Sequence, residues 1–446
     1  MTWYKKINTN ERLRWLAVAV CVVAGIGAVI GGSIAGPRVQ AGFGVICFIA
    51  IVAACSPQLQ AVNWRTVWFG LALQIGLALF VLKFEIFGVR PGYLIFEGLA
   101  NVVRHFLEFT NAGSRFVFGG LADPDVMSSV FPGGLVLAFT ALPPIIFVSS
   151  FFTLLYHFGI LQVVVRLMAR AMMFLLHTSG AETLSATANV FMGQTEAPLM
   201  VKPYVANMTR SELLALMTGG LATISGGMMA VYIGIGADPV AILTTSVMAA
   251  PCGLYLSKIL LPETETPETG GRTTFDVNRS HTNAIDAIAS GASDGVRLVI
   301  NVAAMLIAFL AFIEMINYLL GLIDADLSLS RIFSLVFAPV AFLIGIPIAE
   351  VPAVADLLGT KLVANEFVAY LKLTSDYKEV LSERSFILVT FALTGFANFG
   401  SVGIQLGGIG GIAPERRGDL ARLGWWALLA GFFSTMINAS LASILL

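Results

Sequence analysis

Residues 384–410 read RSFILVTFALTGFANFGSVGIQLGGIG, and residues 210–236 read RSELLALMTGGLATISGGMMAVYIGIG. The two stretches have the same length, both begin Arg-Ser, both carry small residues in the middle and both end Gly-Ile-Gly. An apolar segment that contains charges precedes each stretch, and a further apolar run follows it. This matching order of neighbours favours a duplicated unit over a chance likeness between two glycine-rich segments.

The composition of the whole chain is typical of a membrane protein. Of the 446 residues 57% are hydrophobic and 12% are charged, too few charges to cover a soluble protein of this length, and the mean hydropathy is +0.86. The net charge of −1 gives no reason to expect a nucleic-acid partner. Uncharged runs occur at 15–36, 39–64, 66–82, 126–156, 213–237, 239–257, 298–313, 385–414 and 423–446. Each run is long enough, or nearly so, for one helix to cross the ~30 Å hydrocarbon layer, and the runs do not alternate as barrel strands would.

Several further stretches do not fit a simple crossing. Residues 94–112 are amphipathic, and we predict that they lie along the membrane interface. Residues 180–206 and 350–373 carry charges among apolar and small residues, so we predict two re-entrant hairpins, each a helix, an irregular tip and a second helix. Residues 262–281 are polar and rich in proline and glycine, which favours a linker, followed by a short amphipathic helix at 282–297.

The placement of charges predicts that the two repeats are inverted. One side of the spans is basic, which the positive-inside rule makes cytoplasmic. This side carries Lys5, Lys6, Arg12, Arg14, Arg166, Arg170, Lys258, Arg272, Arg279, Arg297, Arg416, Arg417 and Arg422. Asp324 and Asp326 fall on the other side, although Lys378 and Arg384 do not follow the rule. The first hairpin then enters from the cytoplasm and the second from outside, an arrangement typical of secondary transporters.

The predicted fold is therefore an all-α integral membrane protein with about eight or nine transmembrane helices, two re-entrant helical hairpins and an inverted repeat. In such proteins the substrate site lies near the midplane, between the repeats. Glycines in the middle of the duplicated stretches, such as Gly226, Gly227 and Gly400, would let a helix unwind and let the backbone approach a ligand.

The two hairpin tips carry candidate binding residues. The first tip is Gly193-Gln194-Thr195-Glu196, and the second contains Asn365-Glu366. An ionisable residue at membrane depth is costly and by default marks a pathway or a site, although Glu196 and Glu366 could instead sit at interfaces or pair with Lys202 and Lys361. A carboxylate is a good acceptor for the vicinal hydroxyls of a sugar, and the glutamine, threonine and glutamate suit the polar edge of a heterocycle.

The second duplicated stretch adds three candidates in its middle. Phe396 could stack on a flat ring or pack in the core. Asn398 and Ser401 are three residues apart and share one helix face if the helix persists.

A sodium site is predicted at the flank of the first hairpin and the middle of the first duplicated stretch. Sodium takes several oxygen ligands, often from unwound backbone. Asn189 and Thr223 could supply side-chain oxygens, and Met192 and Ile224 could supply carbonyls. Asn189 could equally cap the hairpin, and Thr223 could equally bond within its own helix.

The remaining motifs argue against an enzyme or an ATP-driven pump. The four histidines and four cysteines form no metal spacing. The sequence contains no Walker A motif, no HExxH motif and no serine-histidine-aspartate set that we can place.

At these residues the chain resembles the concentrative nucleoside transporter family, and we identify it as similar to bacterial members. The resemblance rests on Gly193-Gln194-Thr195-Glu196 with Ala-Pro-Leu following, on GTKLVANEFVAYL at 359–371, and on GFANFGSVGIQLGGIGGIAPERRGD at 395–419. It extends from about residue 40 to the C-terminus. Two positions depart from the familiar pattern: Met228 stands where a smaller branched residue is usual, and Thr223 stands where serine is usual.

The resemblance implies a homotrimer in which a scaffold domain holds a mobile transport domain. It implies that Gln194, Thr195 and Glu196 face a nucleobase and that Glu366, Asn398 and Ser401 face the ribose. Met228 would line the base pocket, Phe396 would lie beside the site, and Asn189, Met192, Thr223 and Ile224 would form the sodium site. The implied parts are an extra N-terminal helix (1–38), scaffold helices with an interfacial helix (39–178), a first transport repeat of hairpin 1 and two spans (179–261), a linker and interfacial helix (262–297), a scaffold helix and connector (298–349), and a second transport repeat of hairpin 2 and two spans (350–446).

The expected function is a sodium-coupled symporter that imports nucleosides such as uridine or adenosine across the inner (plasma) membrane. Its transport domain would move like an elevator, giving alternating access. Proton coupling through Glu196 or Glu366 is an alternative, and a passive channel or a membrane enzyme is another. The base preference and the sodium stoichiometry stay open at this point.

Overall fold

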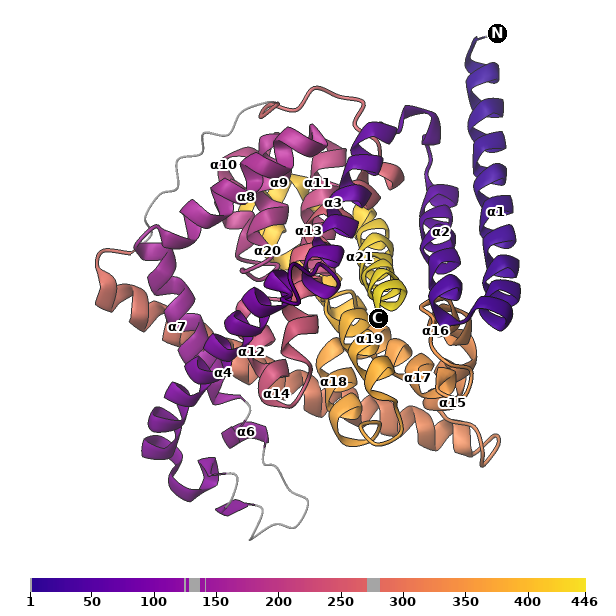
Figure 1. Ribbon diagram of the computed structural model, residues 1–446. Helices are drawn as coiled ribbons and strands as arrows, with labels where there is room; N and C mark the ends of the chain where they lie inside the picture. Colours follow the sequence, from indigo (N-terminus) through magenta and orange to yellow (C-terminus); the bar gives the residue numbers. More distant parts are fainter. Residues whose placement is uncertain (1, 124–125, 128–136, 141, 271–280) are drawn as a thin grey trace.

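A computed structural model describes residues 2–123, 126–127, 137–140, 142–270 and 281–446 of the chain as an assembly of helices (Figure 1). The first half contains α1 (Thr2–Ala35), α2 (Pro37–Cys55), η1 (Leu59–Ala61), α3 (Trp64–Leu82), α4 (Pro91–Phe118), η2 (Gly119–Ala122), α6 (Leu137–Thr140), α7 (Pro143–His157), α8 (Ile160–Leu176), α9 (Gly180–Ala188), η3 (Ala197–Val201), α10 (Lys202–Val205), α11 (Arg210–Ala222), α12 (Gly226–Gly234) and α13 (Pro239–Leu260). The second half contains α14 (Ala284–Gly321), α15 (Leu329–Val336), α16 (Ala338–Leu343), α17 (Val351–Val363), α18 (Glu366–Ser375), α19 (Glu383–Leu393), α20 (Phe399–Ile412), η4 (Pro414–Arg416) and α21 (Arg417–Leu445).

The number of apolar helices agrees with the predicted membrane fold. Within the described residues, eight helical segments are long and apolar enough to cross a bilayer. The broken pair α19 and α20 adds a further crossing, because α20 is apolar but too short to span alone. Of the predicted span 126–156, the structure describes the apolar segment Ala138–His157 apart from residue 141, and residues 128–136 lie outside the described part.

Helix α14 differs from the prediction for residues 282–313. The predicted boundary at 297 does not coincide with a helix end, because α14 runs without interruption for 38 residues, across the lower half of the view in Figure 1. Two glycines explain how a polar start and an apolar end fit one helix. A Cβ on Gly291 would lie 2.7 Å from the Cα of Ser150, and one on Gly295 would lie 2.6 Å from the Cα of Ile146. The polar half of α14 therefore packs backbone to backbone on α7.

Both predicted hairpins are present. The first consists of α9, an irregular tip and the short helices η3 and α10. The second consists of α17 and α18, which are separated only by Ala364 and Asn365. Side-chain caps begin one helix of each hairpin: Ser179 forms a capping box with Glu182 at α9, and Asn365 accepts from the Val368 N–H at 2.9 Å at α18.

The long helix α21 shows that the hairpins are inverted. At its beginning, Arg416 donates to the carbonyls of Ala206 and Met208 at the end of the first hairpin, at 2.8 and 2.6 Å. At its other end, the Ser443 carbonyl accepts from Arg384 at 2.8 Å. Arg384 follows Ser382, whose N–H and hydroxyl both donate to Glu350 at the start of the second hairpin. Because α21 has 29 residues, the two hairpin bases lie about 40 Å apart along it.

Both duplicated stretches are broken in the middle. The first is interrupted at residues 223–225, between α11 and α12, and the second at residues 394–398, between α19 and α20. Ser225 and Asn398 cap the helices that follow. The Phe396 N–H donates to the Thr223 carbonyl at 3.1 Å, so the two breaks contact each other directly.

A buried charge cluster fixes the base of the first hairpin. The Lys258 ammonium lies 2.6 Å from a Glu182 oxygen and 2.8 Å from the Ser211 hydroxyl, and both Glu182 and Lys258 are buried. The Ser179 hydroxyl donates to Glu212 at 2.5 Å, which joins the capping boxes of α9 and α11. Three helices therefore meet around one ammonium group.

We expect Lys258→Met to destabilise the protein by about 3–5 kcal/mol, because it leaves a buried carboxylate without its counter-charge. The measurement is the thermal unfolding midpoint of the purified protein in detergent at neutral pH. Lys378→Met is the matched control: Lys378 is exposed, so its loss should change stability by no more than about 0.5 kcal/mol. Equal midpoints for the two variants would contradict a structural role for the cluster.

Candidate functional site

The tip of the first hairpin is folded around Glu196. Its carboxylate accepts from the Gly193 N–H at 3.0 Å, which closes the turn between the two arms. Thr195 and Glu196 are exposed, whereas Gln194 is buried and its Oε1 has no hydrogen-bond partner among the described residues. Pro198 then begins the descending arm in η3. The tip thus presents one charged acceptor outward and one neutral acceptor inward.

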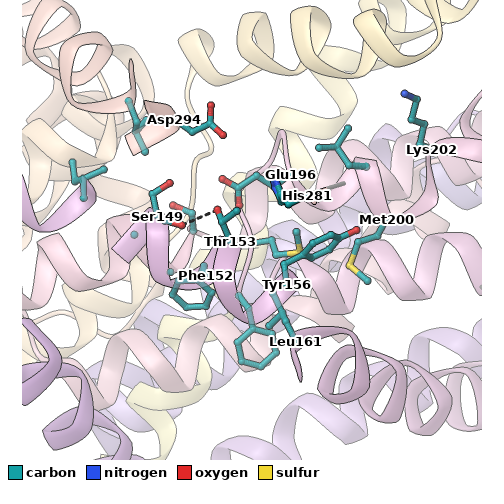
Figure 2. A pocket seen from close by; sticks show the side chains of 18 of the residues that line it. Ser149, Phe152, Thr153, Tyr156, Leu161, Glu196, Met200, Lys202, His281 and Asp294 are labelled. Atoms are coloured by element: carbon teal, nitrogen blue, oxygen red, sulfur yellow. Dashed lines mark hydrogen bonds between the residues drawn. The ribbon is translucent and has the colours of Figure 1, made fainter. Parts of the chain in front are cut away.

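The Glu196 carboxylate lines a cavity of about 700 Å³ (Figure 2). The walls come from α7, the first hairpin, the start of α12 and α14. In Figure 2 the Asp294 side chain lies next to that of Glu196, above the α7 side chains, while Lys202 points away from them. Ser149, Thr153 and Tyr156 line the α7 side. The cavity is large enough for a drug-sized organic ligand and offers it two carboxylate acceptors together with hydroxyl groups that both donate and accept.

The tip of the second hairpin places Glu366 in a buried hydrogen-bond group. One carboxylate oxygen accepts from the Tyr232 hydroxyl at 2.8 Å and the other from the Asn398 amide at 2.8 Å. Glu366 is only 4% exposed. Lys361 donates to the Ala392 carbonyl instead, so among the described residues neither Glu366 nor Glu196 takes part in an ion pair. The alternative of tip glutamates paired with lysines does not describe this structure.

Asn398 and Ser401 lie close together, but only Ser401 belongs to the helix. Asn398 precedes α20 as its N-cap, and its oxygen accepts from the Ser401 N–H at 2.8 Å. The same asparagine therefore begins the helix with its oxygen and holds Glu366 with its amide nitrogen. Phe396, two residues earlier, lies within the break and is half-buried.

The two hairpin tips converge on the crossing of the broken spans. A Cβ on Gly220 would lie 2.9 Å from the Gln194 Cβ, and one on Gly408 would lie 3.0 Å from the Thr195 Cγ2. The first tip is therefore seated on α11 and α20, where a larger residue would not fit. Met228 is buried in the first turn of α12, directly after the cavity-lining Gly226 and Gly227.

The predicted site residues fall into two groups in this structure. Met192 and Glu196 line the cavity, whereas Glu366, Asn398 and Ser401 are buried and are not among its lining residues. Tyr232 connects them, because it belongs to α12, whose first turn lines the cavity, and its hydroxyl contacts Glu366.

The predicted sodium ligands meet where two helices end. Asn189 is the C-cap of α9 and Thr223 is the C-cap of α11. The Asn189 amide donates to the Ser185 carbonyl, while its Oδ1 is fully buried and has no partner among the described residues. Within that part of the chain, the carbonyls of Met192 and Ile224 also accept no hydrogen bond. Unused neutral oxygens beside the negative ends of two helix dipoles fit a monovalent cation.

Several residues of the site were not predicted from the sequence, among them Tyr232, Asp294 and the α7 residues Ser149, Thr153 and Tyr156. Tyr232 looks like an ordinary core aromatic, and Asp294 like a solvated charge of an amphipathic helix. The only signal for Tyr232 was its place in the half of the duplicated stretch that follows the glycine pair.

Comparisons with known proteins agree in placing this chain among transporters. Residues 241–443 match the family described as Na+ dependent nucleoside transporter C-terminus, and residues 43–121 match the corresponding N-terminus family. Residues 138–239, which include the first hairpin, match the Gate family, described as nucleoside recognition.

Similar proteins come from bacteria and mammals. An uncharacterized transporter of Haemophilus influenzae is 42% identical over 411 residues, which is 90% of this chain and 96% of the relative. The sodium/nucleoside cotransporter 1 of Homo sapiens is 40% identical over 460 residues, 97% of this chain and 68% of the relative.

Solved structures show the same fold in two states. CNTnw in an inward-facing substrate-bound state has a TM-score of 0.86 at 38% identity, and the match covers 92% of this chain and 98% of that one. A doubly substituted CNTnw in an outward-facing state has a TM-score of 0.87 with the same identity and coverage.

Proposed function

Because the chain belongs to the concentrative nucleoside transporter family, we propose that the cavity beside Glu196 and the buried Glu366 group are two parts of one nucleoside site. The protein is a multi-pass membrane transporter, a secondary active symporter that couples nucleoside import to sodium by elevator-type alternating access. The observation that carries the site proposal is the convergence of both hairpin tips on the crossing of the broken spans.

The Glu366 end of the site suits a ribose. An ionised carboxylate has about four acceptor positions, and Tyr232 and Asn398 use one on each oxygen. The remaining positions can accept from two vicinal hydroxyls. Ser401, in the first turn of α20 beside Asn398, adds a hydroxyl that both donates and accepts.

The Glu196 end suits a nucleobase. Gln194 has a buried oxygen with no partner in the described part of the chain, Thr195 adds a hydroxyl, and Glu196 can accept N–H groups from the cavity side. Gly193 lets the tip close tightly, since its N–H reaches the Glu196 carboxylate. Met228 lies in the first turn of α12, beside this region, and would restrict the size of the nucleobase. Phe396 lies in the second break, two residues before Asn398.

Asn189, Met192, Thr223 and Ile224 would hold the sodium ion with two side-chain and two backbone oxygens. A bound sodium ion would supply positive charge where α9 and α11 both end. These residues flank the first hairpin tip and the first break, so ordering them also orders Gln194 and Ser225. Coupling of this kind is reciprocal: a nucleoside on the tip favours the sodium-binding geometry as much as sodium favours the nucleoside-binding one.

The exposed helices support a homotrimer embedded in a bilayer. In the most apolar part of α14 only 6% of the residues are buried, compared with 89% in α13. A helix with so much exposed apolar surface must be covered by lipid or by another subunit. The helices of residues 39–178 and 298–349 would form the fixed scaffold, the repeats at 179–261 and 350–446 the moving part, and the inner (plasma) membrane of a bacterial cell the location.

The deciding experiment is uptake of radiolabelled uridine and adenosine into proteoliposomes, with sodium and proton gradients imposed separately. We expect accumulation above the external concentration only with an inward sodium gradient. Uptake is measured for both nucleosides because the size of the Met228 side chain would favour either the purine or the pyrimidine.

Three results would count against the proposal. Accumulation driven by protons without sodium would identify a proton symporter that uses a tip glutamate. Uptake that stops at equal concentrations would identify a passive channel, and chemical conversion of the nucleoside would identify an enzyme.

A further inference from the structure

Each repeat brings the C-terminal ends of two helices together. In the first repeat these are α9, which ends at its C-cap Asn189, and α11, which ends at its C-cap Thr223. In the second repeat they are α17, capped by Ala364, and α19, capped by Thr394. The end of an α-helix carries partial negative charge and unpaired carbonyls. Each repeat therefore creates one place where a cation is favoured.

The first repeat supplies no cation of its own at this place. Neither α9 nor α11 has a basic residue in its last turn. The buried Asn189 Oδ1 has no partner among the described residues, and the Met192 and Ile224 carbonyls there accept no hydrogen bond. This arrangement leaves oxygen ligands for an ion from solution.

The second repeat supplies its own cation. Lys361 lies in the last turn of α17, is fully buried and donates to the Ala392 carbonyl in the last turn of α19 at 2.7 Å. It also donates to the Thr435 hydroxyl at 2.9 Å and lies 5.8 Å from the centre of the Phe432 ring. No carboxylate lies within ion-pairing distance of Lys361 among the described residues. A buried lysine at membrane depth is energetically costly and by default indicates a functional role.

The other polar groups at this place are also satisfied. The Tyr370 hydroxyl donates to the Thr390 carbonyl at 2.9 Å and lies 2.6 Å from the Thr394 hydroxyl. Within the described residues, no side-chain oxygen beside the ends of α17 and α19 is buried without a partner. The helix ends of the second repeat thus differ from those of the first in two ways. They already hold a cation, and among the described residues they offer no unpartnered side-chain oxygen to an ion.

We propose that the Lys361 ammonium is a tethered cation that does for the second repeat what sodium does for the first. It holds the end of α19 to the second hairpin five residues before Glu366. It thereby fixes the position of the second break, which carries Asn398, relative to Glu366. Lys361 is a positioning residue: it acts through the backbone of α17 and α19. This inference rests on the proposed sodium site, because it treats the two places as equivalent.

The test compares Lys361→Ala with Lys361→Met in proteoliposomes, at fixed sodium, with and without ethylammonium chloride. We expect both variants to lose uptake by about 10- to 100-fold, the range for two buried acceptors that lose a charged donor. Ethylammonium should restore uptake in the alanine variant, which leaves space for it, but not in the methionine variant. Tetramethylammonium chloride is the matched salt control, because it is cationic but has no N–H to donate.

Lys361→Met with normal uptake and a normal sodium activation curve would overturn the proposal, because only the side-chain volume would then matter. An alanine variant that ethylammonium fails to restore would also count against it. If the alanine variant does not fold, Thr435→Val decides: it keeps the lysine but removes one acceptor, and uptake should fall by about 3- to 10-fold. Unchanged uptake in the valine variant would overturn the inference.

The wild-type sodium activation curve separates the two proposals. If wild-type uptake ignores sodium, the proposed coupling fails whatever Lys361 does. If wild-type uptake needs sodium and the Lys361→Met curve matches it, only the tethered cation is wrong.

Discussion

We expect Glu366→Gln to reduce nucleoside uptake by at least about a hundredfold, while the protein still folds. Glutamine has nearly the same shape but lacks the charge that accepts strongly from two ribose hydroxyls. Charged hydrogen bonds contribute about 1.5–3 kcal/mol each, so losing two costs about 3 kcal/mol or more, which is at least about two powers of ten. The new amide nitrogen also meets a donor, since one Glu366 oxygen accepts from Asn398 and the other from Tyr232.

The measurement is initial uptake of labelled uridine into proteoliposomes, with gel filtration and a thermal midpoint to establish that the variant is folded. Glu379→Gln makes the same chemical change on an exposed residue and should transport normally. Near wild-type uptake by the Glu366 variant would remove this glutamate from the site.

The overall architecture was accessible from the sequence because its signals are local. Uncharged runs of known length predict the crossings, and charges within small-residue segments predict the hairpins. The breaks were predicted from a local signal too, the glycines Gly226, Gly227 and Gly400, and in the structure Ser225 and Asn398 cap the helices that follow. The repeat added what local signals lack, namely the pairing of each hairpin with its broken span.

The contacts that build the site were not accessible in this way. Tyr232 and Glu366 are separated by 134 positions and come from different repeats, so their hydrogen bond depends on how the two halves pack. The continuous α14 was missed because its polar beginning looks interfacial until Gly291 and Gly295 are seen against the backbone of α7. The same applies to Lys361, whose partners Ala392 and Thr435 lie on two other helices.

The second large effect is expected for the sodium site. Asn189→Leu keeps the branched shape of the side chain but removes the buried Oδ1, which has no partner among the described residues. We expect the sodium concentration for half-maximal uptake to rise by about 10- to 100-fold, because one neutral oxygen ligand in a buried site contributes about 1–3 kcal/mol. At low sodium the variant should therefore accumulate almost no nucleoside.

The control for this variant is Thr223→Ser, which keeps the hydroxyl that donates to the Gly219 carbonyl at 2.9 Å and should leave the sodium dependence nearly unchanged. Both curves are measured by uptake at varied sodium, with total ionic strength held constant by choline chloride. An Asn189→Leu curve that overlays the wild type would place the ion elsewhere. If instead the asparagine variant shifts and the serine variant does not, the coupling ion is bound where α9 and α11 end, next to the tip that carries Gln194 and Glu196. That location explains how an ion with no contact to the nucleoside controls its binding: both depend on the same turn of backbone.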